Sequence, residues 1–92
     1  MKHYYVQGAD GKFFTPGLHK RNYVDADGVQ YTVRVMWIDG IGFYRVHEQV
    51  GGCYRVTPFT HWFQTEQEAQ EELDIEASAQ GWPEWKEEEN GD

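Results

Sequence analysis

The stretch of sequence that decides the fold is VQYTVRVMWIDGIGFYRVH, residues 29–47. Two runs of β-branched and aromatic residues flank Asp39-Gly40, a pair that tolerates positive φ and is typical of two-residue hairpin turns. Ile38 should then pair with Ile41, and this register decides which side chains share a face of the sheet. The pairs that follow along the hairpin are Val33 with Val46, Val35 with Tyr44, and Arg34 with Arg45.

Further strands are expected on both sides of this hairpin. Turn pairs of the same kind occur at Asp10-Gly11, Asp27-Gly28 and Gly51-Gly52. Short β-branched or aromatic runs lie between them, as they do between the turns of antiparallel sheets. Residues 18–24 fit either a loop or an edge strand. The runs expected as strands are Tyr4-Tyr5-Val6, Phe13-Phe14, Val29 to Ile38, Ile41 to His47, and Tyr54 to Thr57.

One helix is expected after the last strand, with clear signals at both ends. Thr65 followed by Glu68 is a capping box. Gly81 suits the left-handed position that ends a helix, and Pro83 forbids its continuation. Between these ends, a narrow apolar stripe recurs at every fourth residue, which is the spacing of one helix face. The stripe consists of Ala69, Leu73 and Ala77.

These signals predict an α+β fold, with an antiparallel β-meander of about four to six strands packed by one C-terminal α-helix. Ninety-two residues are enough for one domain, which we place at residues 1–83. Residues 84–92 are mostly acidic and are expected to form a flexible tail. We expect Trp62 to lie in the core. Trp85 either folds back onto the sheet or anchors a partner.

The faces of the sheet depend on the turn before the last strand. With a three-residue loop at Val50-Gly51-Gly52, Tyr54 and Val56 would join the apolar face, which the helical stripe covers. Arg55 would then join Arg34 and Arg45 on the opposite face. Like charges opposed across strands are unfavourable. Acidic residues of the chain could neutralise them, they could extend into water, or they could bind an anion.

Charge is divided unevenly along the chain. The net charge is −8. Residues 1–60 hold seven Lys/Arg and five Asp/Glu, a net of +2, whereas residues 61–92 hold one Lys and eleven Asp/Glu, a net of −10. An acidic helix and tail repel nucleic acid and favour a protein partner with a basic surface. A single cysteine, no signal-peptide pattern and no membrane-spanning run indicate a cytoplasmic protein without a membrane partner.

The sequence contains no recognisable catalytic or cofactor-binding motif. The four histidines and Cys53 lack metal-ligand spacing, so no metal or other cofactor is expected. A Cys53 nucleophile with His47 or His61 as its base would need a third, orienting residue, and none is indicated. The histidines and Cys53 therefore give no support to an enzyme.

The first functional hypothesis is a non-enzymatic inhibitor or regulator that docks on a basic, nucleic-acid-binding protein surface. In size, acidity and lack of a motif, the chain resembles in type the small proteins that phages and mobile elements encode against host nucleases, anti-CRISPR proteins among them. The candidate contacts on the helix are Glu68, Glu71, Glu72, Asp74, Ile75 and Glu76. Those on the tail are Trp85, Glu87 and Glu88.

Two other hypotheses use the sheet. A nucleic-acid or anion-binding module could use arginines and aromatic rings on one face, because such sheets bind single strands. Its candidate residues are Arg34, Arg45, Arg55, His47 and Phe43. An accessory subunit of a larger assembly would instead expose an apolar patch around Met36, Ile38 and Phe43. The oligomeric state is left open.

Overall fold

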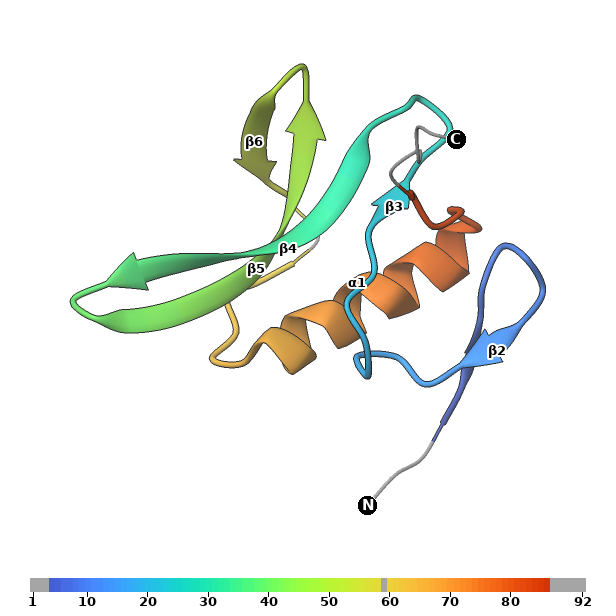
Figure 1. The fold of residues 1–92 in the computed structure, drawn as a ribbon, viewed down its shortest axis with the longest axis horizontal. Helices are drawn as coiled ribbons and strands as arrows, with labels where there is room; N and C mark the ends of the chain where they lie inside the picture. The colour runs from blue at the N-terminus through green and yellow to red at the C-terminus, as the bar shows by residue number, and fades with distance from the viewer. Residues whose placement is uncertain (1–3, 59, 87–92) are drawn as a thin grey trace, which may run out of the picture.

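The computed structural model describes residues 4–58 and 60–86, which form two antiparallel sheets and one helix (Figure 1). The predicted α+β class is confirmed. Strands β1 (Val6–Gln7) and β2 (Phe13–Phe14) form a small hairpin of their own. The larger sheet is a meander in the order β3-β4-β5-β6, and α1 (Glu66–Gln80) packs against it. The bounds of its strands are β3 Tyr23–Val24, β4 Gln30–Ile38, β5 Ile41–Val50 and β6 Cys53–Val56.

The central hairpin has the predicted register. Ile38 pairs with Ile41, and Arg34 pairs with Arg45. Asp39, at φ 53°, is the only described residue other than glycine with positive φ, as a two-residue turn of this kind demands. The end of the hairpin projects beyond α1 as a two-stranded arm (Figure 1). We call residues 35–43 the β4–β5 arm.

The expected three-residue loop before β6 is wrong. Val50 pairs directly with Cys53, so the turn has two residues, Gly51 and Gly52. Because side chains alternate along a strand, this shift by one residue exchanges the faces of β6. Tyr54 therefore lies on the side of Arg34, and Arg55 lies on the other side, paired with Glu48 at 2.8 Å.

The core forms where α1 crosses β4 and β5. The predicted stripe of Ala69, Leu73 and Ala77 is buried completely or nearly so, and it packs on Val33 and Val46. Large aromatic rings close one end of this core: Tyr31 stacks on Trp82, with ring centroids 4.3 Å apart. The remaining members of the core are Tyr23 and, partly buried, Val29, Tyr44 and Phe63.

Both ends of α1 follow the sequence signals. The Thr65 hydroxyl accepts a hydrogen bond from the Glu68 backbone N–H at 3.2 Å and donates one to the Glu68 carboxylate at 3.0 Å. At the other end Gly81 has φ 75°, and the Trp82 N–H donates to the Ala77 carbonyl at 2.9 Å. These bonds satisfy backbone groups that a helix terminus would otherwise leave unpaired.

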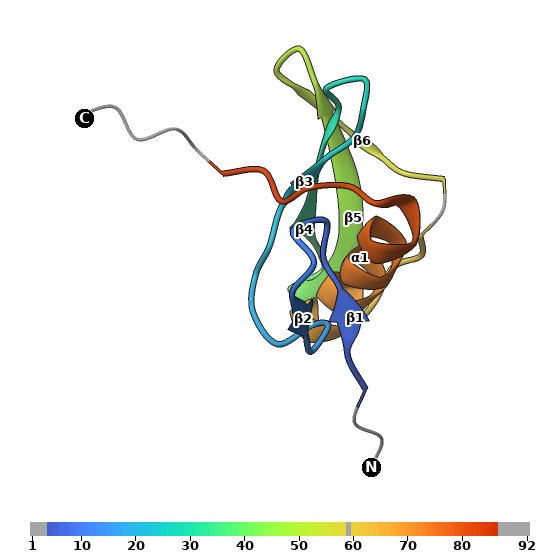
Figure 2. The same ribbon diagram turned by 90° about the vertical axis from the view of Figure 1, so that its right-hand side faces the viewer.

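Segments outside the named strands extend the sheet. Tyr23 forms a bridge with Glu84, and the Trp85 N–H donates to the Asn22 carbonyl at 2.8 Å. Residues 18–24 are thus mainly loop, ending in the short edge strand β3. In Figure 2 the segment after α1 runs across the β3 end of the molecule.

Candidate protein-docking surface

Four of the five acidic candidates on α1 surround one shallow hollow of about 500 Å³. Tyr4 and Phe63 supply apolar walls beside Ile75, which is 41% exposed. Four carboxylates line the same hollow, and no lysine, arginine or histidine is among its lining residues. We call this surface the acidic hollow. Its residues are Tyr4, Phe63, Glu68, Glu71, Glu72, Ile75 and Glu76.

The carboxylates of the acidic hollow are only partly satisfied within the described chain. The Tyr4 hydroxyl donates a hydrogen bond to Glu71; this bond, with burial and the Glu71 charge, raises the pKa of Tyr4 to about 12. One oxygen of Glu72 lies 3.9 Å from the exposed His61 ring. The other oxygen of Glu72 is buried without a hydrogen-bond partner among the described residues. The hollow therefore presents negative charge that a cationic group could satisfy.

Asp74 does not belong to this surface, which corrects the prediction from sequence. Its side chain is fully buried and accepts hydrogen bonds from the Gly17 N–H at 2.7 Å and the Tyr23 hydroxyl at 2.7 Å. Gln70 donates a third hydrogen bond at 3.0 Å. Burial raises the pKa of Asp74, while these hydrogen bonds oppose the shift. Asp74 is therefore a structural anchor that no partner can contact.

The tail candidates are only partly described. Trp85 is half-buried, with its backbone bonded to Asn22 beside β3. Glu87 and Glu88 lie outside the described residues. Trp85 thus lies at the β3 edge and is not part of the acidic hollow.

We call the face of β4 and β5 that carries Arg34 and Arg45 the arginine face. Two of the three predicted arginines lie on it. The Arg34 guanidinium lies 3.8 Å from the centre of the Tyr54 ring, a cation–π contact. Arg45 donates to the Thr57 carbonyl at 3.0 Å and lies 5.4 Å from the Trp62 ring centre. No carboxylate of the described residues forms an ion pair with either guanidinium.

The position of Trp62 also differs from the prediction. It is 37% exposed, so it does not lie in the core, and its ring stands edge-on to His47 at 6.1 Å between centroids. Burial lowers the pKa of His47, and the charges of Arg34 and Arg45 lower it further. Phe43 is half-buried and shares this face through the alternation of β5. Arg55 is absent from the face for the reason given above.

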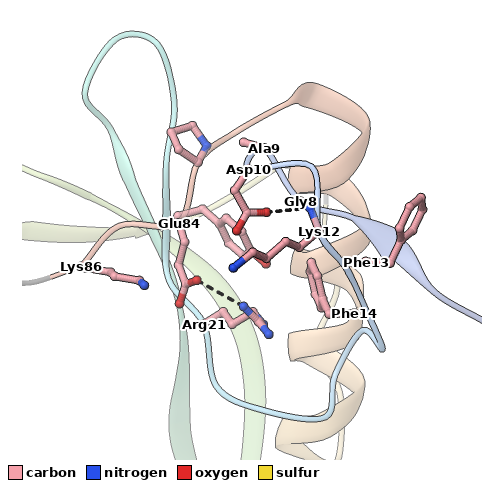
Figure 3. A pocket seen from close by; sticks show the side chains of 11 residues that line it. Gly8, Ala9, Asp10, Lys12, Phe13, Phe14, Arg21, Glu84 and Lys86 are labelled. Carbon is pink, nitrogen blue, oxygen red and sulfur yellow. Dashed lines mark hydrogen bonds and ion pairs between the residues drawn. The ribbon is translucent and has the colours of Figure 1, made fainter.

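A second hollow, of about 470 Å³, was not predicted from sequence (Figure 3). Arg21 lies over the Phe14 ring at 4.1 Å and pairs with Glu84 at 3.2 Å. Lys12 and Lys86 also line it, together with Asp10, so three cationic and two acidic side chains meet here. Its walls come from the β1–β2 hairpin, the loop before β3 and the segment after α1. No sequence spacing connects such distant segments, so only the folded chain reveals this hollow.

Chemistry-bearing side chains are dispersed in the part of the chain described. Cys53 is exposed at the start of β6. Within residues 4–58 and 60–86, no group of three or more His, Cys, Asp or Glu side chains is placed to hold a metal ion. No described helix has the length and apolar character needed to cross a membrane.

The chain was compared with protein-family models, curated proteins and solved structures. None of the three comparisons gives a match.

Proposed function

We propose that the chain is a non-enzymatic protein-interaction domain whose acidic hollow docks on a basic surface of another protein. The observation that carries this proposal is the convergence of Glu68, Glu71, Glu72 and Glu76 around one apolar-walled depression. A basic partner would gain charge-assisted hydrogen bonds from the carboxylates. Its apolar groups could pack on Ile75 and Phe63.

The chemistry of the hollow favours inhibition or regulation of a nucleic-acid-binding protein. Carboxylates on a rigid helix are spaced along a row, as phosphates are along a nucleic-acid strand. They can therefore compete for an arginine- and lysine-lined channel, with fast and salt-sensitive association. An inhibitor of this kind would act as the small proteins do that phages and mobile elements encode against host nucleases, which the chain resembles in type.

The proposal is tested by binding to a defined basic polypeptide, protamine, at low and high salt. The test variant is Glu72→Gln/Glu76→Gln, which removes two charges from the acidic hollow. The control variant is Asp27→Asn/Asp39→Asn, which removes two charges from turns outside it. Asn tolerates the positive φ of position 39. We expect protamine to bind the test variant several-fold more weakly than it binds the control variant and the unchanged chain.

Equal weakening of both variants would show attraction to net charge alone and would overturn the proposed site, as would no weakening in either. Capture from a cell lysate follows with the same three proteins. A specific partner must be retained by the control variant, lost by the test variant and released by added salt.

A second candidate function, binding of single-stranded nucleic acid, is favoured by the arginine face. Arg34 and Arg45 lie beside aromatic rings without a carboxylate partner among the described residues, and the Arg45 Nε atom is buried without a hydrogen-bond partner. An oligonucleotide should then bind the unchanged chain, and Arg34→Gln should weaken it more than Lys20→Gln. The absence of binding at low salt would exclude this function.

A further inference from the structure

The β4–β5 arm exposes large apolar side chains on both of its faces. Trp37 is 66% exposed and Ile41 is 57% exposed. Across from Trp37 stands Gly42, and an added Cβ there would lie 3.1 Å from the indole ring. The ring therefore lies over the neighbouring strand as an open apolar surface. The other exposed side chains of the arm are Val35, Met36 and Ile38.

The outer edge of β4 is open along this arm. Strand β3 pairs only with Gln30 and Tyr31. The Val33 carbonyl faces outward and accepts a hydrogen bond from the Lys20 ammonium at 2.9 Å. Along an antiparallel strand, the N–H and C=O groups of successive residues point alternately to the two neighbouring sides. Val35 and Trp37 therefore turn these groups outward, as Val33 does. No described strand pairs with these two residues on that side. An exposed apolar edge of this kind is a template for another strand.

We propose that this edge is a self-association site at which a second copy of the chain pairs with β4. A two-fold axis beside Met36 brings Val35 of each copy opposite Trp37 of the other. Both residues of each pair point their backbone groups across the axis, which gives four hydrogen bonds between the copies. The large Trp37 ring then lies beside the smaller Val35 side chain on the same face of the joined sheet.

The distribution of charge favours a second copy of the chain as the partner at the β4 edge. Two chains of net charge −8 repel one another unless they meet away from their acidic parts. Asp39 is the only charged residue in the β4–β5 arm. In the proposed register Asp39 lies opposite Val33 of the other copy, whose carbonyl holds the Lys20 ammonium. The contact is thus complementary to itself, as a two-fold interface must be.

The exposed area of the arm favours a weak contact. Five side chains expose between 39% and 66% of their surfaces, which corresponds to roughly 500 Å² for residues of about 150–250 Å² each. Strand pairing at the edge leaves the faces of the arm partly open, so two copies would bury less than about 1,000 Å² of apolar area, the size of a weak interface. We therefore expect a reversible dimer that depends on protein concentration.

Sedimentation equilibrium from micromolar to sub-millimolar concentration tests this inference. Trp37→Lys places a charge in the contact, and Val35→Pro removes an outward N–H that serves no hydrogen bond within the described sheet. Both variants should be monomeric wherever the unchanged chain is a dimer. The control, Leu18→Lys, changes an exposed apolar residue of the loop before β3 and should dimerise normally.

Circular dichroism of each variant checks that the fold is retained; Trp37 is exposed, so its replacement leaves the core intact. A monomer at every concentration would overturn the inference. So would a dimer that persists in the folded Trp37→Lys variant, because the copies would then meet elsewhere. Neither result bears on the acidic hollow, whose test uses other residues.

Discussion

Asp74 shows how one side chain can connect three parts of the fold. Its carboxylate receives hydrogen bonds from the loop at Gly17, from β3 through Tyr23, and from Gln70 one helical turn away. Gly17 is itself restricted, because it has φ 83° and an added Cβ would lie 2.9 Å from the Gln67 carbonyl oxygen. The buried face of α1 is thus wider than its apolar stripe, and its polar part holds the N-terminal loop in place.

Replacing Asp74 should be costly. Asp74→Ala leaves three buried donors without an acceptor, and each such donor costs about 1–3 kcal/mol. We expect urea unfolding to show a loss of about 3 kcal/mol or more in the free energy of unfolding. Glu76→Ala on the exposed side should change it by no more than about 0.5 kcal/mol. Similar losses in the two variants would contradict the assigned role of Asp74.

His47 should make stability depend on pH. Burial lowers the pKa of folded His47 below its ordinary value of 6.5, so the unfolded chain binds a proton more readily than the folded protein. The free energy of unfolding should therefore fall as the pH drops through 6.5 toward the folded value. The His47→Gln variant should lose part of this slope in urea unfolding between neutral pH and about pH 5. An unchanged slope, matching that of a His19→Gln control, would contradict this assignment.

At the scale of elements, local signals were sufficient wherever one interaction decides the geometry. The Asp39-Gly40 turn gave the register of β4 and β5, and Thr65, Glu68 and Gly81 gave the ends of α1. The faces of β6 could not be predicted, because Val50-Gly51-Gly52 is compatible with turns of two or three residues and the two choices reverse every side chain. Trp62 was placed wrongly because an aromatic residue fits a core or an arginine-lined face equally well.

The cap of α1 gives a test at this scale. Thr65→Ala removes the hydroxyl that accepts from the Glu68 N–H, and loss of such a cap costs about 1 kcal/mol. Urea unfolding should show this loss, whereas Thr65→Ser, which keeps the hydroxyl, should lose only a small part of it. If serine and alanine are equally destabilising, the hydroxyl is not the source of the stability.

At the scale of the whole molecule, the charged side chains are concentrated on separate parts of the surface. Four glutamates surround the acidic hollow, while the β4–β5 arm is almost free of charge and the second hollow combines Lys12, Arg21 and Lys86 with Asp10 and Glu84. The helix candidates were predictable because helical spacing places them on one surface. The same spacing sets Asp74 about 100° away from Ile75, toward the buried face of α1, but its partners Gly17 and Tyr23 lie far away in the sequence.

Net charge should also affect stability. A compact chain of charge −8 is destabilised by its own repulsion, and dissolved salt screens that repulsion. Raising sodium chloride from about 20 to 200 mM should increase the free energy of unfolding by up to about 1 kcal/mol. The Glu72→Gln/Glu76→Gln variant, with less charge to screen, should gain less. A decrease with salt would show that attractive ion pairs dominate.

The late position of α1 in the chain has a consequence for protein synthesis. Leu73 covers Val33 and Val46, and Asp74 supplies the acceptor for Gly17 and Tyr23, so β3, β4 and β5 emerge from the ribosome before the helix that contacts them. We therefore expect the nascent meander to lack a stable tertiary structure before α1 is available. We expect its apolar surfaces to stay accessible to chaperones until translation has passed Trp82.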